Sequence, residues 1–535
     1  MIARLQYFHS DQLYITPNRH QTIKYVFENA VIRHADNPLL ISDEDGSTFS
    51  YRDAAEIVDA ITKKLSQSGL KKGDRIIVYS AMHSEAIFLF WASMRMGFVF
   101  VPVDHLTPQP AFDDIVRRVD AKLIFCDQER LPTVALFAHS TSVIFDADNS
   151  EAQSTQIVFS NWVNDRGEGM ISLPEVVPED EAVILFTSGT TGNSKGVLLT
   201  QGALYRSGLQ ISEGYEWETR DVLLSMGELH AMSGLRNPCI APLFAGSSIV
   251  VTSSRVRSNV IALARCIQDR KCTILNTVPS AVRQFDQFTE RIGREMLSSL
   301  RCVLCTGSDL SEALIQSFEE QYGVPILDYY GLTETCGFCI GVPLHGREHA
   351  KGTLGLPVGC IAQVVDENDR ILGFDRIGEL RIYSENLMNC YYQEEALTNA
   401  VLRNGWFYTG DLANIRSDNH IVLTGRKKDI IKDKFGNVVY PVEVEQCISG
   451  HPGVADVVVV GFRPVNEDEK LAAFVVPRDE SVQADALLGE LRSHIRDTIG
   501  SHKIPQILKL QGRIPMNSNG KPDKKILIDE LHLRN

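Results

Sequence analysis

The segment from Thr187 to Gly196 reads TSGTTGNSKG and combines glycines, hydroxyl side chains and one lysine. Backbone N–H groups and hydroxyls of such a loop can donate hydrogen bonds to phosphate oxygens, and the lysine adds positive charge. It is not a Walker A loop, because that motif requires Gly-Lys-Ser/Thr before a helix, whereas the apolar run VLLT follows here. We therefore predict a phosphate-binding loop between two strands; a plain polar hairpin tip is the alternative. The expected phosphate contacts are Thr187, Ser188, Gly189, Thr190, Thr191, Gly192 and Lys195.

Further motifs carry side chains suited to the rest of a nucleotide. Tyr330, in YYGLTET, can stack on adenine, and Glu334 in the same motif can hold a magnesium ion through its carboxylate oxygens. Asp411, in YTGDL, can accept hydrogen bonds from two ribose hydroxyls. Each residue alone has an ordinary alternative. Tyr330 could be a core ring, and the two carboxylates could cap helices or turns.

Five motifs, in their order and spacing, resemble those of the adenylate-forming superfamily, which includes acyl-CoA synthetases, luciferases and peptide-synthetase adenylation domains. They are TSGTTGNSKG, YYGLTET, YTGDL, GRKKD and NSNGK, and the similarity covers about residues 20 to 530. The resemblance implies an ATP site with magnesium on Glu334. It assigns catalytic roles to Lys521, Glu334, Thr187, His230 and Lys428. Besides the phosphate loop, it assigns nucleotide contacts to Gly307, Ser308, Tyr329, Tyr330, Gly331, Thr333, Glu334, Asp411, Arg426 and Lys521.

The resemblance is looser at three places. Gly307 and Ser308, in CTGSDL, match a segment that lines the adenine and acyl sites, although Asp309 replaces the usual proline or alanine. His230 matches a histidine at the mouth of the acyl pocket, but with one extra residue before Gly234, so a structural histidine is the alternative. The segment after Lys428, DIIKDKFGNVV, is closer in length to fatty-acyl ligases than to many small aryl-acid ligases. This departure leaves the route of the acyl acceptor open.

The implied reaction joins a carboxylic acid to the α-phosphate of ATP, with release of pyrophosphate, and then transfers the acyl group. Two anions meet in the first step, so positive charge from Lys195, Lys521 and magnesium is required. The implied acceptor is the thiol of coenzyme A. A separate carrier protein or an amine remains an alternative acceptor. A P-loop-like hydrolase and an inactive ATP-binding scaffold are alternatives of another class.

The acid itself is less well defined by the sequence. No aspartate lies between His230 and Gln268 to hold an ammonium group, so an α-amino acid is disfavoured. The expected pocket walls are small and weakly polar, which suits an aliphatic or simple cyclic acid. Arg236 could pair with a second carboxylate of the substrate; a structural or solvated arginine is the alternative. The expected walls are residues 276–280, Gly307, Tyr330 and residues 336–338.

The elements that position these motifs have an α/β pattern. Short β-branched runs alternate with amphipathic stretches from about residue 48, which predicts parallel-rich sheets covered by helices. A small β region is expected from about residue 375. We predict a large N-terminal domain over residues 1–424, a hinge over 425–428 and a mobile α+β C-terminal domain over 429–535. Domain alternation about Lys428 would let the acceptor reach the carbonyl that Lys521 had covered.

Composition narrows the partners and the location. The chain has 535 residues and a formal net charge of −15, so it repels polyanions, and nucleic acid is an unfavourable partner. The most apolar stretch, residues 86–103, contains Arg95, Gly97 and Pro102, which predicts a buried helix and strand rather than a membrane span. The eleven cysteines follow no disulfide pattern, and we expect reduced thiols and a cytoplasmic location. A four-sulfur zinc site at residues 302, 305, 336 and 339 is the alternative use of two cysteine pairs.

Overall fold

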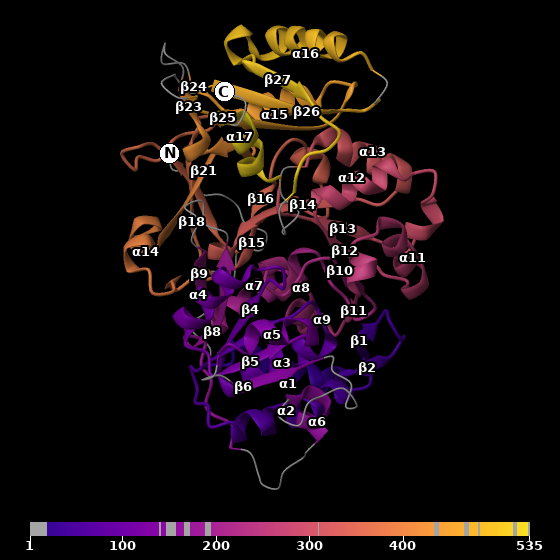
Figure 1. The fold of residues 1–535 in the computed structure, drawn as a ribbon, viewed down its shortest axis with the longest axis vertical. Helices are drawn as coiled ribbons and strands as arrows, with labels where there is room; N and C mark the ends of the chain where they lie inside the picture. Colours follow the sequence, from indigo (N-terminus) through magenta and orange to yellow (C-terminus); the bar gives the residue numbers. More distant parts are fainter. Residues whose placement is uncertain are drawn as a thin grey trace.

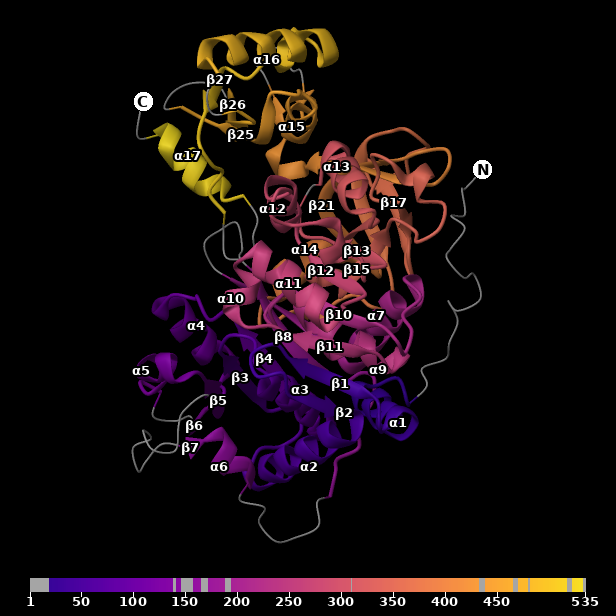
Figure 2. The same ribbon diagram turned by 90° about the vertical axis from the view of Figure 1, so that its right-hand side faces the viewer.

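Two large sheets with helices between them form the first three quarters of the molecule (Figure 1). The computed structural model describes residues 19–137, 141–145, 157–164, 172–187, 194–308, 310–432, 438–464, 470–479, 482–516 and 522–532. A smaller antiparallel sheet lies beside the two large ones, and a compact C-terminal unit lies at one end (Figures 1 and 2). The predicted α/β class, with a large and a small part, is confirmed.

The first large sheet has eight strands and carries the phosphate-loop motif near one edge. Its central strands are parallel, and the last pairs, β8 with β9 and β9 with β19, are antiparallel. In spatial order the strands are β19 (Cys390–Tyr391), β9 (Lys195–Thr200), β8 (Glu181–Thr187), β4 (Val99–Val103), β3 (Arg75–Tyr79), β5 (Leu123–Cys126), β6 (Thr141–Ile144) and β7 (Ile157–Val158).

The second large sheet has nine strands and carries the YYGLTET motif where β14 ends. Its middle is parallel and both edges are antiparallel. In spatial order the strands are β16 (Leu356–Pro357), β15 (Gly337–Gly341), β14 (Ile326–Leu332), β13 (Cys302–Cys305), β12 (Ile274–Thr277), β10 (Val222–Ser225), β11 (Ser248–Val251), β1 (Pro38–Ser42) and β2 (Thr48–Ser50).

One continuous hydrophobic cluster joins the two large sheets through the helices between them. These helices are α1 (Ile23–His34), α2 (Tyr51–Gln67), α3 (Ser84–Met96), α7 (Gln201–Gly214), α8 (Met232–Cys239) and α9 (Ala241–Ala245). The outer faces are covered by α4 (Gln109–Val119) and α5 (Leu131–Val134) on the first sheet, and by α11 (Val260–Arg270), α12 (Pro279–Gln287) and α13 (Glu312–Tyr322) on the second. Two short helices, α6 (Phe159–Asn164) and α10 (Ser254–Arg257), complete the first part.

The most apolar stretch forms α3 and β4, as predicted. Gly97 ends the helix in a left-handed conformation with φ 65°, which glycine adopts without steric cost. The guanidinium of Arg95 forms ion pairs with Asp59, at 2.5 Å between Nη1 and Oδ1, and with Glu28. Among the described residues, no helix is long and apolar enough to cross a bilayer.

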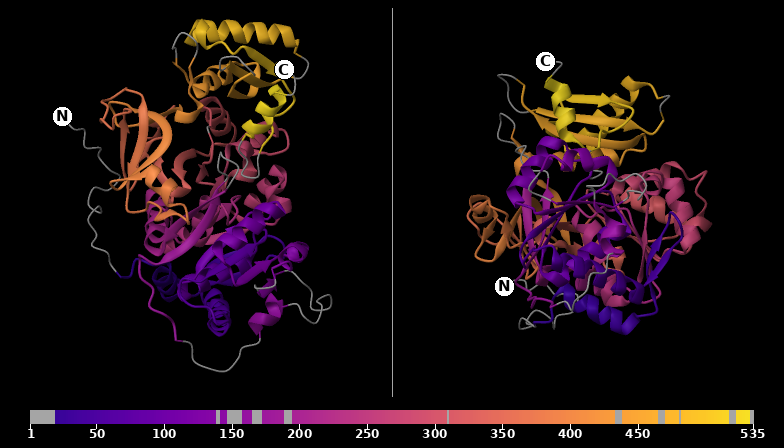
Figure 3. Two further views of the ribbon diagram at one scale, coloured as in Figure 1. Left: turned by 60° about the vertical axis from the view of Figure 1, so that its left-hand side comes forward. Right: turned by 60° about the horizontal axis from the view of Figure 1, so that its bottom comes forward.

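The small β region is a five-stranded antiparallel sheet that carries the YTGDL motif. It begins at Ile361, somewhat before the predicted start near residue 375. Figure 3 shows it, in orange, beside the large sheets and next to the C-terminal unit. Its strands are β17 (Ile361–Val365), β18 (Gly378–Tyr383), β21 (Trp406–Ile415), β20 (Leu402–Arg403) and β22 (Ile421–Arg426), with α14 (Glu395–Val401) before β20.

The C-terminal unit has its own hydrophobic core on both faces of a three-stranded sheet. Helices α15 (Pro441–Ser449) and α16 (Ala484–Ile499) cover one face, and α17 (Lys524–His532) covers the other. The strands are β25 (Val454–Phe462), β26 (Lys470–Pro477) and β27 (Ile507–Leu510), preceded by the pair β23 (Ile431–Lys432) and β24 (Val438–Val439). Because each face packs within the unit, its core is separate from that of the large sheets.

Candidate active site

The phosphate-loop motif lies between two paired antiparallel strands, as predicted. Thr187 is the last residue of β8 and lies opposite Lys195, the first residue of β9. The Thr187 hydroxyl donates to the Lys195 carbonyl oxygen at 3.5 Å. The predicted contacts Ser188, Gly189, Thr190, Thr191 and Gly192 lie outside the described residues. The loop therefore connects the end of β8 to the start of β9.

Tyr391 connects Lys195 to Glu334. The short strand β19 places Tyr391 opposite Val197 of β9, and the ammonium of Lys195 lies 5.0 Å from the centre of the Tyr391 ring. The Tyr391 hydroxyl donates to Glu334 Oε1 at 2.7 Å. Burial, followed by the charge of Glu334, raises the pKa of Tyr391, so the phenol keeps its proton and remains a donor. Lys195 and Glu334 thus contact the same side chain, Lys195 at the face of its ring and Glu334 at its hydroxyl.

Asp411, in the YTGDL motif, contacts one residue of the YYGLTET motif and one of the GRKKD motif. Its side chain is buried, with 3% of the residue exposed. The Tyr330 hydroxyl donates to Asp411 Oδ2 at 2.6 Å, and Arg426 Nε lies 3.1 Å from Oδ1. Burial, followed by the charge of Asp411, raises the pKa of Tyr330 well above its usual value. Asp411 therefore contacts two other predicted nucleotide residues directly.

The two tyrosines near the end of β14 point to opposite faces of the strand. Successive residues of a strand point to opposite faces, so Tyr330 reaches Asp411 while the Tyr329 hydroxyl lies 3.2 Å from Arg236 Nη2. Thr306, directly before Gly307 and Ser308, donates from its hydroxyl to the Tyr329 carbonyl oxygen at 2.7 Å. Gly307 has φ 108°, a conformation that favours glycine. The predicted segment at 307–308 thus lies against the tyrosine motif.

Glu334 is positioned by a short turn. Gly331 pairs with Phe338 across β14 and β15, and Thr333 begins the 3₁₀ turn Thr333–Thr335. The Thr335 hydroxyl accepts from the Leu332 backbone N–H at 2.9 Å, which fixes the start of the turn. The turn directs the Glu334 carboxylate toward Tyr391, so the predicted magnesium residue faces the phosphate-loop strands.

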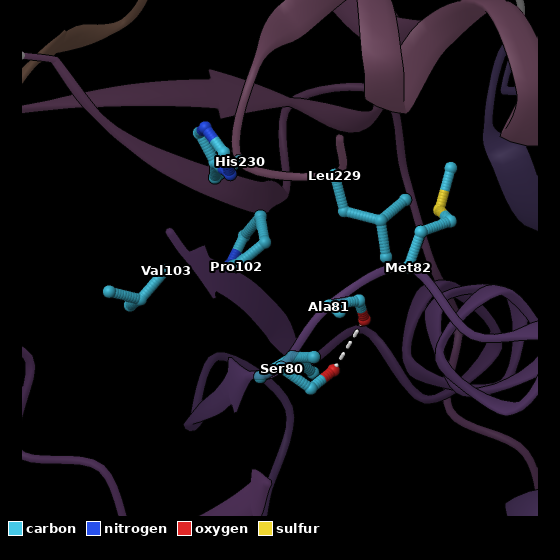
Figure 4. A pocket seen from close by; sticks show the side chains of 8 residues that line it. Ser80, Ala81, Met82, Pro102, Val103, Leu229 and His230 are labelled. Carbon is cyan, nitrogen blue, oxygen red and sulfur yellow. Dashed lines mark hydrogen bonds between the residues drawn. The ribbon is translucent and has the colours of Figure 1, made fainter. Parts of the chain in front are cut away.

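His230 lies on a small pocket with mostly apolar walls (Figure 4). Leu229 and Met82 line one side of it, and Pro102 and Val103 line the other. The remaining lining residues are Val78, Ser80 and Ala81. Both the chemical role of His230 and its place at the mouth of an acyl pocket stay predictions.

A cluster of charged residues surrounds His230 that the motifs did not reveal. Asp104 Oδ2 lies 3.8 Å from His230 Nε2, and His105 Nδ1 lies 3.3 Å from Glu228 Oε2. The contact with Glu228 raises the pKa of His105 despite burial. Burial works to raise the pKa of Glu228, but His105 and Arg257 outweigh it and hold that pKa below its usual value. The cluster therefore favours an ionised Glu228 beside a charged His105.

Lys428 lies in a 3₁₀ turn, Lys427–Asp429, directly after β22 and before the C-terminal unit. The neighbouring Lys427 donates from Nζ to Glu379 Oε2 at 2.8 Å, which holds the start of this turn on the antiparallel sheet. Lys521 lies outside the described residues. Both flanks of its loop are described and held together, because Met516 and Pro522 form a β-bridge and the Asp523 N–H donates to the Pro515 carbonyl oxygen at 2.8 Å.

Sequence reasoning missed Tyr391, which connects two predicted site residues. The signal available was weak: it consists of an aromatic pair, Tyr391–Tyr392, within the segment that predicts the small β region. Nothing in the local pattern predicts that β19 returns to pair with β9. Asp104, His105 and Glu228 were likewise not assigned to one cluster, since they lie on separate segments.

Comparisons with known proteins agree with this arrangement. The model of AMP-binding enzymes matches residues 27–392, and that of the AMP-binding enzyme C-terminal domain matches residues 443–521. Sulfoacetate–CoA ligase of Cupriavidus necator is 26% identical over 92% of this chain and 95% of its own length. A long-chain-fatty-acid–CoA ligase of Escherichia coli O157:H7 is 26% identical over 96% of both chains.

The fold agrees with that of solved structures. The anthranilate CoA ligase AuaEII in complex with anthranoyl-AMP superimposes with a TM-score of 0.87 at 22% identity, over 97% of this chain and 98% of that one. The ordered motifs, the paired strands around the phosphate loop and the match over most of the length lead to one assignment: this chain belongs to the AMP-binding enzyme family, a family of AMP-forming ligases.

Proposed function

We propose that this protein activates a carboxylic acid with ATP to an acyl-adenylate, with release of pyrophosphate, and transfers the acyl group to coenzyme A. The observation that carries the proposal is that Tyr391 contacts both Lys195 and Glu334, while Tyr330, four residues before Glu334, donates to Asp411. The relatives named above are ligases for coenzyme A, which favours the thiol as acceptor. A carrier protein or an amine would replace it if coenzyme A gave no product. We propose the cytoplasm as its location on the cysteine pattern of the sequence alone.

Each described residue has a role in this reaction that follows from its chemistry. Lys195, at the start of β9, brings positive charge to the phosphates where the acid and ATP approach as two anions. Asp411 accepts hydrogen bonds from the ribose hydroxyls, with Arg426 and Tyr330 holding its two oxygens in place. Tyr330 and the 307–308 segment form the adenine side of the site. His230 lies at the acyl entrance.

Glu334 fits a magnesium ion by the chemistry of its side chain. Its carboxylate is half-buried and has one described donor, Tyr391, so its other oxygen remains able to bind a hard cation. Bound magnesium would neutralise phosphate charge. Tyr391 orients the carboxylate, since its phenol keeps its proton and holds Oε1.

The reaction products give a direct test of the proposal. We expect ATP consumption to require an added carboxylic acid and to yield AMP and pyrophosphate in equal amounts. Trapping with hydroxylamine, repeated with coenzyme A, a carrier protein and a panel of amines, identifies the acid and the acceptor together. ADP and orthophosphate as the main products would instead indicate a hydrolase.

Asp411→Ala should weaken ATP binding about tenfold to a hundredfold. The charged hydrogen bonds that it removes contribute about 1.5–3 kcal/mol. Isothermal titration with a non-hydrolysable ATP analogue measures the effect. Asp411→Asn keeps the size of the side chain and should lose less affinity. A dissociation constant that is unchanged in Asp411→Ala would contradict a role of this aspartate in holding the ribose.

A further inference from the structure

Arg236, in helix α8, is a fully buried arginine whose described polar partners are all neutral. Its residue is 0% exposed. Nε donates to Asn237 Oδ1 at 2.9 Å, and Nη2 donates to the Tyr329 hydroxyl at 3.2 Å. Nη1 is buried and has no hydrogen-bond partner in the part of the chain that the structure describes. Within the same part, no carboxylate lies within ion-pair distance of this guanidinium.

The groups around Arg236 stay neutral at ordinary pH. Burial raises the pKa of Tyr329, although Arg236 itself opposes this, so Tyr329 remains a phenol. Burial also raises the pKa of Cys336 to about 12, so this thiol does not supply a negative charge. Asn237 is in turn bonded to Asn276, at 2.8 Å between Nδ2 and Oδ1. The groups around Arg236 therefore form hydrogen bonds with it but carry no negative charge.

A buried guanidinium in such surroundings is unfavourable without a bound anion. Arginine does not deprotonate in proteins, so the site cannot relieve the charge by losing a proton. Buried charges are normally paired, and an uncompensated one costs stability. Arg301 of the same chain is paired with an acidic residue in the usual way, since its guanidinium forms two contacts of 2.9 Å with the carboxylate of Asp221. Arg236 differs by having a free N–H and no such partner.

The free Nη1 group lies between two parts of the candidate site. Helix α8 begins at Met232, two residues after His230, and Arg236 lies one helical turn further on. On the other side, a β-carbon at Gly337 would collide with Arg236 Nη1, so this atom lies directly against the Gly337 backbone. Gly337 follows Glu334 by three residues. The guanidinium is therefore deeper than His230 and close to the turn that carries Glu334.

We infer that Arg236 binds a second acidic group, a carboxylate or a sulfonate, at the far end of the acid that this enzyme activates. The inference rests on the proposed function and defines its substrate class as short acids with two anionic groups. Nη1 donates to the distal group, whereas the reacting carboxylate lies near Lys195 and the α-phosphate. Arginine suits this task, since its planar donors match the oxygens of a carboxylate or sulfonate.

Matched pairs of acids test the inference on the unmodified enzyme. Pyrophosphate release is measured with succinate against butyrate, glutarate against pentanoate, adipate against hexanoate, and sulfopropionate against butyrate. At the best chain length we expect kcat/KM for the doubly acidic substrate to exceed that of its partner at least about tenfold. Equal or better use of the monoacid at every length would overturn the inference while leaving the proposed function intact.

Variants test whether Arg236 is the residue that causes the preference for doubly acidic substrates. Arg236→Gln should remove the preference and leave the monoacid reaction within a few fold. The matched control Arg301→Gln breaks a paired, half-buried arginine, so it should lower the melting temperature without changing the ratio between the paired acids. A loss shared equally by both acids in Arg236→Gln would mean that Arg236 is structural. If that variant does not fold, the comparison on the unmodified enzyme decides.

A binding measurement separates failure of the inference from failure of the proposed function. If no acid of any kind releases pyrophosphate, the proposed function is wrong. Thermal shifts with glutarate and with pentanoate, each in the presence of ATP, then test Arg236 without turnover. Stabilisation by glutarate alone, absent in Arg236→Gln, would support the anion site. The same shift for both acids, or none for either, would overturn it.

Discussion

Lys521→Ala is expected to slow acyl-adenylate formation by about 10²–10³-fold, which is about 3–4 kcal/mol of transition-state stabilisation. The reason is that a positioned ammonium can bridge the acid carboxylate and the α-phosphate while their charges meet. Transfer of the acyl group from pre-formed acyl-AMP should be almost unchanged, because that step no longer needs this bridge. Single-turnover assays of each half-reaction measure the two effects separately.

The described residues on either side of the Lys521 loop are held together. The β-bridge between Met516 and Pro522 closes the loop at its base. Directly after it, α17 packs Leu527 and Leu531 against the sheet residues Val458 and Phe474. We propose that this base positions Lys521 for the adenylation step. Rigid support of this kind is what a preorganised donor requires.

A lysine four residues further along the chain provides the control for Lys521→Ala. Lys525 is exposed in the first turn of α17, so Lys525→Ala changes the net charge equally without removing a group from the loop. We expect it to retain both half-reactions. Near-normal adenylation by Lys521→Ala, or equal damage to both steps, would remove Lys521 from the assigned role.

Much of the fold follows from sequence because the relevant signals are local. The amphipathic stretch over residues 484–499 forms α16 (Ala484–Ile499), and the apolar stretch near residue 90 divides at Gly97 into α3 and β4. The two strands around the phosphate loop also follow from their own apolar patterns. Periodicity and turn residues are properties of short segments, so they can be read without knowing what each segment contacts.

Long-range contacts explain what the sequence could not predict. Tyr391 reaches the site only because β19 pairs with β9, from a distant part of the chain. The sequence left open whether Arg236 is structural, solvated or paired with a substrate carboxylate, and packing from α8, β14 and β15 encloses it completely. No periodic pattern records such a contact, since it depends on how two separately predicted elements meet.

Lys428→Pro is expected to slow acyl transfer by about a hundredfold while leaving adenylation close to normal. Proline fixes φ and removes the backbone N–H, so one of two backbone conformations at the hinge becomes inaccessible. A penalty of about 3 kcal/mol on the arrangement needed for transfer corresponds to about two orders of magnitude in its population. The change lies in the turn Lys427–Asp429, which connects β22 to the C-terminal unit.

The contacts of the C-terminal unit explain why the two steps should respond differently. In this arrangement the unit is attached to α12 by two ion pairs, Arg283 with Asp456 at 3.6 Å and Arg478 with Asp286 at 4.0 Å. The rotation about Lys428 that we propose for the transfer step would break them and present another face to the large domain, a hinge movement that absorbs its change in a few backbone dihedrals. A proline that fits the first arrangement would leave the first step intact.

Lys428→Ala separates the backbone from the side chain and is the matched control. It removes the ammonium but leaves φ free and keeps the N–H, so transfer should stay within a few fold of the unmodified enzyme. Stopped-flow mixing of pre-formed acyl-AMP enzyme with coenzyme A measures transfer, and pyrophosphate release measures adenylation. Equal loss of both half-reactions in Lys428→Pro would indicate misfolding or a nucleotide contact. Equal slowing of transfer in both variants would show that the lysine side chain, rather than backbone rotation, limits the step.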